Sequence, residues 1–279
     1  MRIDGWTKEE LEYLNENYLT KSYTEIGKVL GRTRVAVMVK ANRTGIKLPQ
    51  KIFFNTDFFK IIDTENKAYW LGFLYADGYV SGQYEMSIAL KGSDVSHLEK
   101  LNNDMNGINV QIKEFDKFLT VTQRYYKMCS IRFYSKKNVD NLSKHGLYAD
   151  KSLSIEFPKL RKDLIRHFIR GFFDGDGCLD SYIDKSKVKN KERFRAKFTC
   201  ASPLFLTELA KILLKNGIRT HYTKNHEGNK SVNLCIGGFG SLRRFLEYIY
   251  EDSSVFLERK NEFYKTHKYL LDLVKDREE

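Results

Sequence analysis

Two stretches of the 279-residue chain read AYWLGFLYADGY and HFIRGFFDGDGC, and each places an aspartate, Asp77 or Asp176, at the end of an apolar segment. A carboxylate in the last turn of a helix meets the negative end of the helix dipole. Two such groups side by side would need a cation to neutralise them. Carboxylate oxygens, with no histidine or cysteine at matching spacing, favour Mg²⁺ or a similar hard ion over zinc. The pattern therefore predicts a divalent-metal site shared by Asp77 and Asp176.

The two stretches have small residues four positions apart, Gly72 with Ala76 and Gly171 with Gly175. This spacing puts the small residues on one stripe of a helix, along which a second helix backbone can lie very close. If the two helices pack side by side in parallel, their ends coincide and the aspartates meet. We expect the glycine after each aspartate to end its helix in the left-handed conformation. In a single copy, Asp-Gly would be read merely as the end of a core helix, but the second copy favours a site.

The chain repeats one order of elements from residue 66 onward: helix, two strands, helix, two strands, helix. Alternation of apolar and polar residues predicts the strands, and amphipathic spacing predicts the helices. The matching pairs of segments are 84–91 with 193–200, 95–108 with 203–218, and 128–134 with 231–238.

Both stretches resemble the LAGLIDADG motif of homing endonucleases, residues 169–177 (IRGFFDGDG) closely and residues 70–78 (WLGFLYADG) more loosely. The likeness covers about residues 55 to 270. It implies an α+β fold in which two pseudo-symmetric αββαββα halves form a DNA-binding saddle, with the motif helices between them. It also implies a monomeric, site-specific double-strand DNA endonuclease that binds Mg²⁺ or Mn²⁺ at the eighth motif residues, Asp77 and Asp176. The sixth residue of the first copy is Tyr75, where the family pattern has aspartate.

The resemblance also implies further site residues. Backbone groups beside the aspartates, at Ala76 and Gly175, join the expected metal site. A lysine near the start of the last helix of each half is an expected catalytic residue, and the matching positions are Lys151 and Lys260. Two weaker candidates for a polar active-site position follow the second strand of each half, at Lys91 and Ser202.

Basic residues at alternate positions of one predicted ribbon give a candidate DNA-binding surface. Alternation puts side chains on one face of a strand pair, and such a ribbon fits the major groove. A run of charge is often only solvated, but beside the two motifs DNA contact is the better interpretation. The row comprises Lys185, Lys187, Lys189, Lys191, Arg193, Arg195 and Lys197; the first half offers Lys113, Lys117, Arg124 and Lys127 around Tyr125 and Tyr126.

The first fifty residues predict three short helices. Capping boxes begin at Thr7 and Ser22, Gly31 stops the second helix, and Thr33 caps the third. Tight turns and a basic third helix are typical of a helix-turn-helix, and the segment resembles Myb-like or SANT-like DNA-binding units. The alternative is a small helical bundle with a solvated charged face. We expect Val35, Ala36 and Val39 to face the other helices, and Arg34, Lys40 and Arg43 to project toward DNA.

These segments predict a helix-turn-helix domain at residues 1–48, a linker at 49–65, and LAGLIDADG halves at 66–158 and 159–279. The composition agrees with a folded protein, because 42% of residues are hydrophobic and 14% are aromatic. A net charge of +12 and an isoelectric point near 9.3 point to a polyanionic partner. Double-stranded DNA is favoured over a membrane, since the chain has no stretch of about 18 apolar residues.

The N-terminus has no apolar signal segment, so we expect an intracellular, non-secreted protein of a bacterial or phage-infected cytoplasm or of an organelle. The four scattered cysteines predict free thiols and no structural zinc. A methionine start, without a Cys or Ser start and a His-Asn end, predicts a free-standing or intron-encoded protein and not an intact intein. Two other functions stay open on the same fold: an intron maturase that binds intron RNA, and a non-catalytic DNA-binding regulator.

Overall fold

The computed structural model describes residues 5–18, 21–46, 52–149, 154–184, 191–224 and 231–272. The chain divides into two compact units, one made of residues 1–54 with 106–110 and the other of residues 55–105 with 111–279. Within the described residues, no helix has the length and apolar character needed to cross a membrane.

The first unit contains three helices: α1 (Lys8–Asn17), α2 (Tyr23–Leu30) and α3 (Arg34–Arg43). Their predicted caps are confirmed, because the side chains of Thr7, Ser22 and Thr33 each accept a hydrogen bond from the third residue of their helix. Gly31 ends α2 with a φ of 65°, as predicted. The helices share a core of their own, made of Trp6, Leu14, Tyr23, Ile26, Val37 and Ala41.

The predicted orientation of α3 was wrong in part. Ala36 packs against the core of this unit and Arg34 and Arg43 are exposed, as predicted, but the other assignments differ. Val37 and Ala41 are buried, whereas Val35 is 57% exposed and Val39 is 40% exposed. Lys40, predicted to project outward, is only 6% exposed. The sequence RVAVMVKANR has small or apolar residues on every side of the helix, so their periodicity selects no face. Packing against the other two helices decides which side is covered.

The second unit has the predicted order of elements, and the α+β prediction is confirmed. Its first half contains α4 (Glu65–Asp77), β1 (Gly78–Ser81), β2 (Glu85–Lys91), the short helix η1 (Gly92–Asp94), α5 (Val95–Asp104), β3 (Ile112–Leu119), β4 (Arg124–Tyr134) and α6 (Lys136–Lys144). Its second half contains α7 (Lys162–Asp176), β5 (Cys178–Asp184), β6 (Lys191–Cys200), α8 (Pro203–Lys215), β7 (His221–Lys224), β8 (Val232–Gly237), α9 (Phe239–Tyr250) and α10 (Glu258–Asp272).

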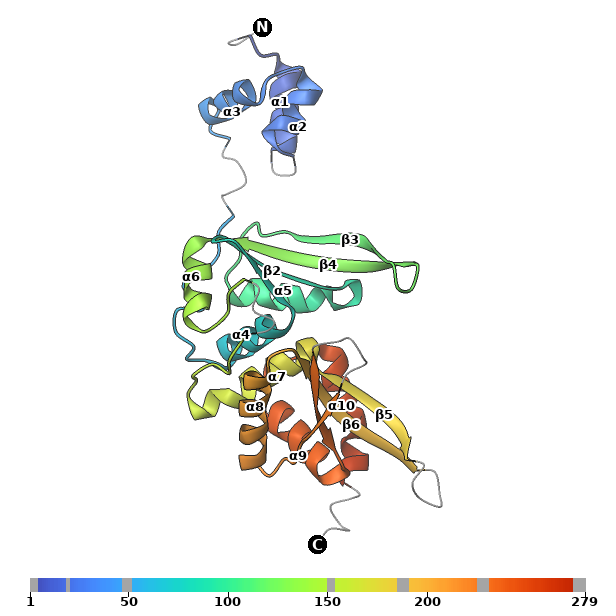
Figure 1. Ribbon diagram of the computed structural model, residues 1–279. Coiled ribbons are helices and arrows are strands. Elements are labelled where there is room, and N and C mark those ends of the chain that lie inside the picture. Colours follow the sequence, from blue (N-terminus) through green and yellow to red (C-terminus); the bar gives the residue numbers. More distant parts are fainter. Residues whose placement is uncertain are drawn as a thin grey trace. The chain divides into compact units, whose positions relative to one another are not determined.

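Each half contains a four-stranded antiparallel sheet, in the order β1-β2-β4-β3 and β5-β6-β8-β7 (Figure 1). Alternate residues of the central strands form the buried face of each sheet. In the first sheet these include Met86, Ile88, Leu90, Ile131 and Phe133; in the second they include Ala196, Phe198, Leu234 and Ile236. The residues between them therefore belong to the opposite face of each sheet.

The helices α4 and α7 lie side by side between the two sheets (Figure 1). Residues 68–75 of α4 are all buried, so this helix is enclosed on every side. At Gly72 an added Cβ would overlap the carbonyl oxygen of Phe168, and at Gly171 it would overlap that of Tyr69. The two backbones thus touch directly, and the packing requires glycine at the third position of each motif, as the small-residue stripe predicts.

Gly78 and Gly177 end these helices for a different reason from the one predicted. Both are extended, with φ of −74° and −70°, so neither adopts the left-handed conformation. An added Cβ would instead overlap the carbonyl oxygen four residues earlier, of Leu74 in one helix and Phe173 in the other. The chain leaves each helix directly into a strand, and only glycine fits against the last turn.

Replacing Gly171 with alanine tests the contact between α4 and α7. Helix propensity alone would favour alanine by about 1 kcal/mol, whereas overlap with a backbone carbonyl costs about 3 kcal/mol. We therefore expect Gly171→Ala to lower the free energy of unfolding, measured in urea, by about 2 kcal/mol or more. Gly237→Ala is the matched control, because its Cβ would meet nothing closer than His221 Cε1 at 3.5 Å. Equal stability of the two variants would contradict this account of the helix contact.

Candidate active site

Asp77 and Asp176 are the last residues of α4 and α7, and the side chains of both are exposed. The two helix ends are close, since a Cβ added to Gly175 would lie 3.3 Å from Asp77 Oδ2 and would overlap the Cβ of Ala76. Both carboxylates also act on the same ammonium group, that of Lys260. The structure thus brings the two predicted aspartates to one place.

Lys260 lies near the start of the last helix of its half, as the resemblance implied, and its side chain reaches the end of α7. It is 6% exposed and occupies the first turn of α10. Its Nζ lies within hydrogen-bond distance of four carbonyl oxygens of the α7 terminus: Phe173 at 2.5 Å, Asp174 at 2.9 Å, Gly175 at 3.3 Å and Gly177 at 2.5 Å. The last carbonyls of a helix have no partner within the helix, and a cation there is favoured by the dipole. Lys260 therefore caps the helix that ends in Asp176.

The electrostatics of the site are unusual at Lys260. Burial lowers its pKa to about 8, Asp174 opposes this shift, and Arg259 adds to it. The charges of Asp77 and Asp176 raise the pKa again. The ammonium is therefore charged at neutral pH, and the group titrates closer to physiological pH than an ordinary lysine does.

Asp174 is a fully buried carboxylate at the sixth position of the second motif. Its oxygens accept hydrogen bonds from Tyr69 Oη at 2.8 Å, Tyr250 Oη at 2.6 Å and the backbone N–H of Leu257 at 2.8 Å. Burial raises the pKa of Asp174, while Lys260 and the three donors oppose that rise. Asp174 was not among the predicted site residues; its only signal in the sequence was an acid within an otherwise apolar helix face.

A second buried polar group ties the start of α4 to α7. Arg170 is fully buried and donates to Glu65 Oε1 at 2.6 Å and to the carbonyls of Val255 and Ile249, each at 2.8 Å. Burial alone would raise the pKa of Glu65, but the Ser254 N–H and Arg170 outweigh it and hold the pKa below its ordinary value. The carboxylate thus stays charged opposite the guanidinium, which avoids an unpaired buried charge.

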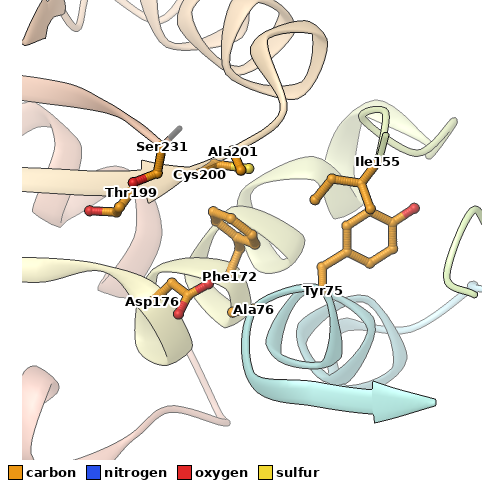
Figure 2. Close-up of a pocket in the computed structure, with 9 residues that line it drawn as sticks. All are labelled: Tyr75, Ala76, Ile155, Phe172, Asp176, Thr199, Cys200, Ala201 and Ser231. Carbon is orange, nitrogen blue, oxygen red and sulfur yellow. The ribbon is translucent and has the colours of Figure 1, made fainter. Parts of the chain in front are cut away.

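A cavity of about 240 Å³ lies beside Asp176 (Figure 2). Tyr75 and Ala76 come from α4, and Phe172 and Asp176 come from α7. Figure 2 shows Thr199, Cys200 and Ala201 at the end of β6 near Ser231, with Ile155 beside Tyr75. The cavity places polar groups of the second sheet next to one of the two aspartates.

The donor set at the two helix ends fits a hard divalent cation. In the part of the chain that the structure describes, no three His, Cys, Asp or Glu side chains gather as a metal-binding group. Mg²⁺ commonly takes only one or two carboxylates and completes its shell with water and substrate phosphates. Asp77, Asp176 and neighbouring backbone oxygens can supply such a set, although the Gly175 carbonyl also accepts a hydrogen bond from Lys260.

The predicted basic row of the second half is described in part. Arg193, Arg195 and Lys197 lie on the open face of the second sheet, as their alternation predicts. Asp180 on β5 pairs with Arg195 at 2.6 Å and lies 3.8 Å from Lys197, so part of this positive charge is compensated. Lys185, Lys187 and Lys189 lie outside the described residues, and so does the side chain of Lys191.

The first sheet carries its basic residues on a long ribbon formed by β3 and β4 (Figure 1). The register puts Lys113, Lys117 and Arg124 on the open face of the sheet. Lys127 lies on the other face and pairs with Asp116 at 3.2 Å, so it does not belong to this basic surface.

The remaining candidates have separate outcomes. Lys91 is exposed at the end of β2, on the open face. Ser202 is 1% exposed; its hydroxyl donates to the Ile155 carbonyl at 2.6 Å and caps α8, so its position is structural. Lys151 lies outside the described residues. All four cysteines lie within the described residues and are thiols that form no disulfide.

Known proteins resemble this chain in two respects: a family model matches the region that contains the second motif, and solved structures share the fold. The family model of the "LAGLIDADG-like domain" matches residues 163–250, which run from α7 through α9. The replication factor C small subunit of Methanocaldococcus jannaschii is 26% identical over 253 residues. That match covers 84% of this chain but only 11% of the length of the archaeal protein.

Solved LAGLIDADG endonucleases have the same fold. The homing endonuclease I-SmaMI bound to cleaved DNA gives a TM-score of 0.54 at 14% identity, over 78% of this chain and 91% of that one. I-SmaMI bound to uncleaved DNA in the presence of calcium gives 0.53 at 14% identity, over 78% and 93%. The meganuclease I-AabMI bound to uncleaved DNA gives 0.50 at 12% identity, over 75% and 92%. At these identities the likeness shows the fold alone, and the predicted LAGLIDADG architecture is confirmed.

The polar network at the site predicts acid sensitivity through His97. Its Nε2 lies 3.0 Å from Tyr69 Oη, and burial, with the charges of Lys100 and Arg259, lowers its pKa from 6.5 to about 3. Between these two values the unfolded chain binds a proton that the folded chain does not, so stability falls as the pH falls. We expect this contribution to approach about 1.4 kcal/mol per pH unit.

Urea unfolding at several pH values between 7 and 4.5 would measure this effect. His97→Gln should flatten the pH dependence by about that amount, whereas His221→Gln, which changes an exposed side chain on β7, should leave it as in the parent protein. An unchanged slope in His97→Gln would show that the buried imidazole is not the source.

Proposed function

We propose that the chain is a monomeric, site-specific double-strand DNA endonuclease of the homing type. The observation that carries this proposal is the convergence of Asp77 and Asp176 at the touching ends of α4 and α7, close to Lys260. Positively charged side chains on the open faces of both sheets agree with a polyanionic substrate. I-SmaMI and I-AabMI, which have the same fold, were solved bound to DNA.

In this proposal Asp77 and Asp176 hold Mg²⁺ or Mn²⁺ together with backbone groups of Ala76 and Gly175. A bound cation would supply Lewis-acid stabilisation of the charge that develops on the phosphoryl group. Each aspartate serves one strand, which accounts for the need for two. Lys260 neutralises the carbonyl end of α7 and so favours a fixed position for Asp176. Lys151 is the corresponding proposal for the first half.

The open sheet faces are the proposed DNA-binding saddle. Side chains on one face of a ribbon can follow the major groove, and lysine or arginine contacts to phosphate supply affinity. The proposed contacts within the described side chains are Arg124, Arg193, Arg195 and Lys197, with Lys113 and Lys117 beside them. Lys185, Lys187 and Lys189 extend this set as predictions.

The three N-terminal helices are proposed to be a helix-turn-helix module that extends the footprint. Only three residues join α2 to α3, as in a helix-turn-helix. The helix α3 has basic residues but no acidic ones, whereas α1 contains four glutamates. The exposed side chains of α3 that would meet DNA are Arg34, Val35, Val39, Asn42 and Arg43. Lys40 lies in the buried part of α3 and is left out of this surface.

Cleavage assays test the two aspartates. Supplied with Mg²⁺, the wild-type chain should cut DNA that carries its uninterrupted insertion site, or members of a randomised duplex library. Asp77→Asn and Asp176→Asn should each reduce double-strand cleavage at least about 100-fold, because a charged group that organises the transition state is lost. The same variants should weaken binding of Mn²⁺ in a calorimetric titration.

Asp163→Asn is the matched control, since Asp163 is an exposed aspartate on α7 whose partner is Arg161. It should cleave as fast as the wild type. If the wild type cuts no DNA but stimulates splicing of an intron RNA, the nuclease proposal is wrong and the maturase function is favoured. Tight DNA binding without cleavage would favour the non-catalytic regulator.

The salt dependence of DNA binding tests α3. If Arg43 contacts a phosphate, Arg43→Ala should weaken binding to a duplex and reduce the slope of log affinity against log salt by about 0.9. Lys8→Ala removes the same charge from exposed α1 and should leave the slope unchanged. Equal effects of the two variants would show that the module contributes only general positive charge.

A further inference from the structure

Asp174 controls the beginning of the helix that carries Lys260. Leu257, whose N–H donates to Asp174 Oδ2, directly precedes α10. The carbonyl of Leu257 accepts from the N–H groups of Lys260 and Asn261, each within 3.1 Å, and so forms the first turn of the helix. The carboxylate therefore fixes the residue from which α10 starts.

Two tyrosines hold the carboxylate itself in place. Tyr69 donates from α4 and Tyr250 from the end of α9, and all three side chains are buried. Asp174 thus joins four helices: its own α7, the partner motif helix α4, and α9 and α10. A carboxylate that accepts three hydrogen bonds in the interior has a strongly determined orientation.

From this start, α10 returns Lys260 to the end of α7. The lysine bonds the carbonyl of Asp174 itself and that of Gly177, on either side of Asp176. The contacts therefore return to where they began. Asp174 fixes Leu257 at the start of α10, and Lys260, three residues after Leu257, bonds the backbone on either side of Asp176. Loss of the first contact should loosen the second.

The position of the first half that matches Asp174 holds no carboxylate. The matching residue, Tyr75, is buried, and its hydroxyl donates to the carbonyl of His145, just after α6. Tyr75 thus ties α4 to the segment after α6 as a hydrogen-bond donor to a backbone C=O, whereas Asp174 accepts a hydrogen bond from a backbone N–H. Nothing in this contact places a lysine at the end of α4.

We infer that Asp174 is a positioning residue that supports only the half of the cleavage centre built around Asp176, so that cutting of the two DNA strands depends on it unequally. The inference rests on the proposed nuclease function. It concerns a fully buried residue that acts through Leu257 and Lys260.

Strand-resolved cleavage tests the inference on the full chain. With a target labelled at both strands, Asp176→Asn first identifies the strand that depends on Asp176. Asp174→Asn should slow the same strand by about 10-fold to 100-fold, the usual cost of losing a supporting contact around a metal site, and nicked DNA should accumulate. Tyr250→Phe and Tyr69→Phe, which each delete one hydrogen bond to the carboxylate, should produce the same strand bias to a smaller extent. Asp163→Asn on the same helix should show no bias.

Hydrogen exchange on the full chain gives a second readout that does not need cleavage. In Asp174→Asn, exchange of the amides of residues 257–261 should rise at least about 10-fold, while the amides of α8 should exchange as in the wild type. If Asp174→Asn does not fold, the two tyrosine variants carry both measurements. Equal slowing of both strands, or unchanged exchange at the start of α10, would overturn the inference. A wild-type chain that cuts no DNA would refute the nuclease proposal, and hydrogen exchange would then decide by itself whether Asp174 holds α10.

Discussion

The direct contact between the backbones of α4 and α7 is the constraint on which the rest of the second unit depends. Gly72 and Gly171 let each helix approach a carbonyl oxygen of the other, and a single added methyl group at either position would overlap it. The helices end together because Gly72 and Gly171 have the same place in the two motifs, ahead of the terminal residues Asp77 and Asp176. Their terminal carbonyls and the carboxylates of Asp77 and Asp176 then share one small region of negative potential.

That negative region explains the positive groups around it. Lys260 is buried, with its Nζ within hydrogen-bond distance of four carbonyls of the α7 terminus. The carboxylate of Asp174 favours the charged form of this lysine, because it raises the pKa of Lys260. A lysine removed from water without such partners would be costly. The exposed carboxylates of Asp77 and Asp176 both raise the pKa of Lys260, and in the proposed nuclease they would also hold a divalent cation.

The sequence predicted the features that depend on local pattern. Helix caps at Thr7, Ser22 and Thr33, the repeated element order and the meeting of Asp77 with Asp176 each follow from a few neighbouring residues or from one repeat. The face of α3 was mispredicted because apolar residues surround that helix. Lys127 was included in the basic set of the first half, although it lies three positions from Arg124 on β4, and an odd spacing along a strand puts two side chains on opposite faces.

The network around Asp174 was beyond sequence reasoning for a related reason. Its partners Tyr69, Tyr250 and Leu257 lie 105, 76 and 83 residues away, and a tyrosine in an apolar helix looks like an ordinary core residue. Asp174 itself was visible as an acid on a buried helix, and a buried carboxylate requires donors. Such a residue allows the prediction that partners exist, although not which they are.

The two halves differ most at the position where the motifs themselves differ. Tyr75 and Asp174 both fasten a motif helix to the segment that follows the last strand pair of its half, but one faces a carbonyl and the other an N–H. A helix that has just ended presents carbonyls, and a helix about to begin presents N–H groups. Tyrosine suits the segment after α6 and aspartate suits the segment before α10. The sequence difference between Tyr75 and Asp174 therefore matches a difference in structure: the first faces the end of a helix and the second faces the start of α10. Through α10, Lys260 bonds the carbonyls on either side of Asp176.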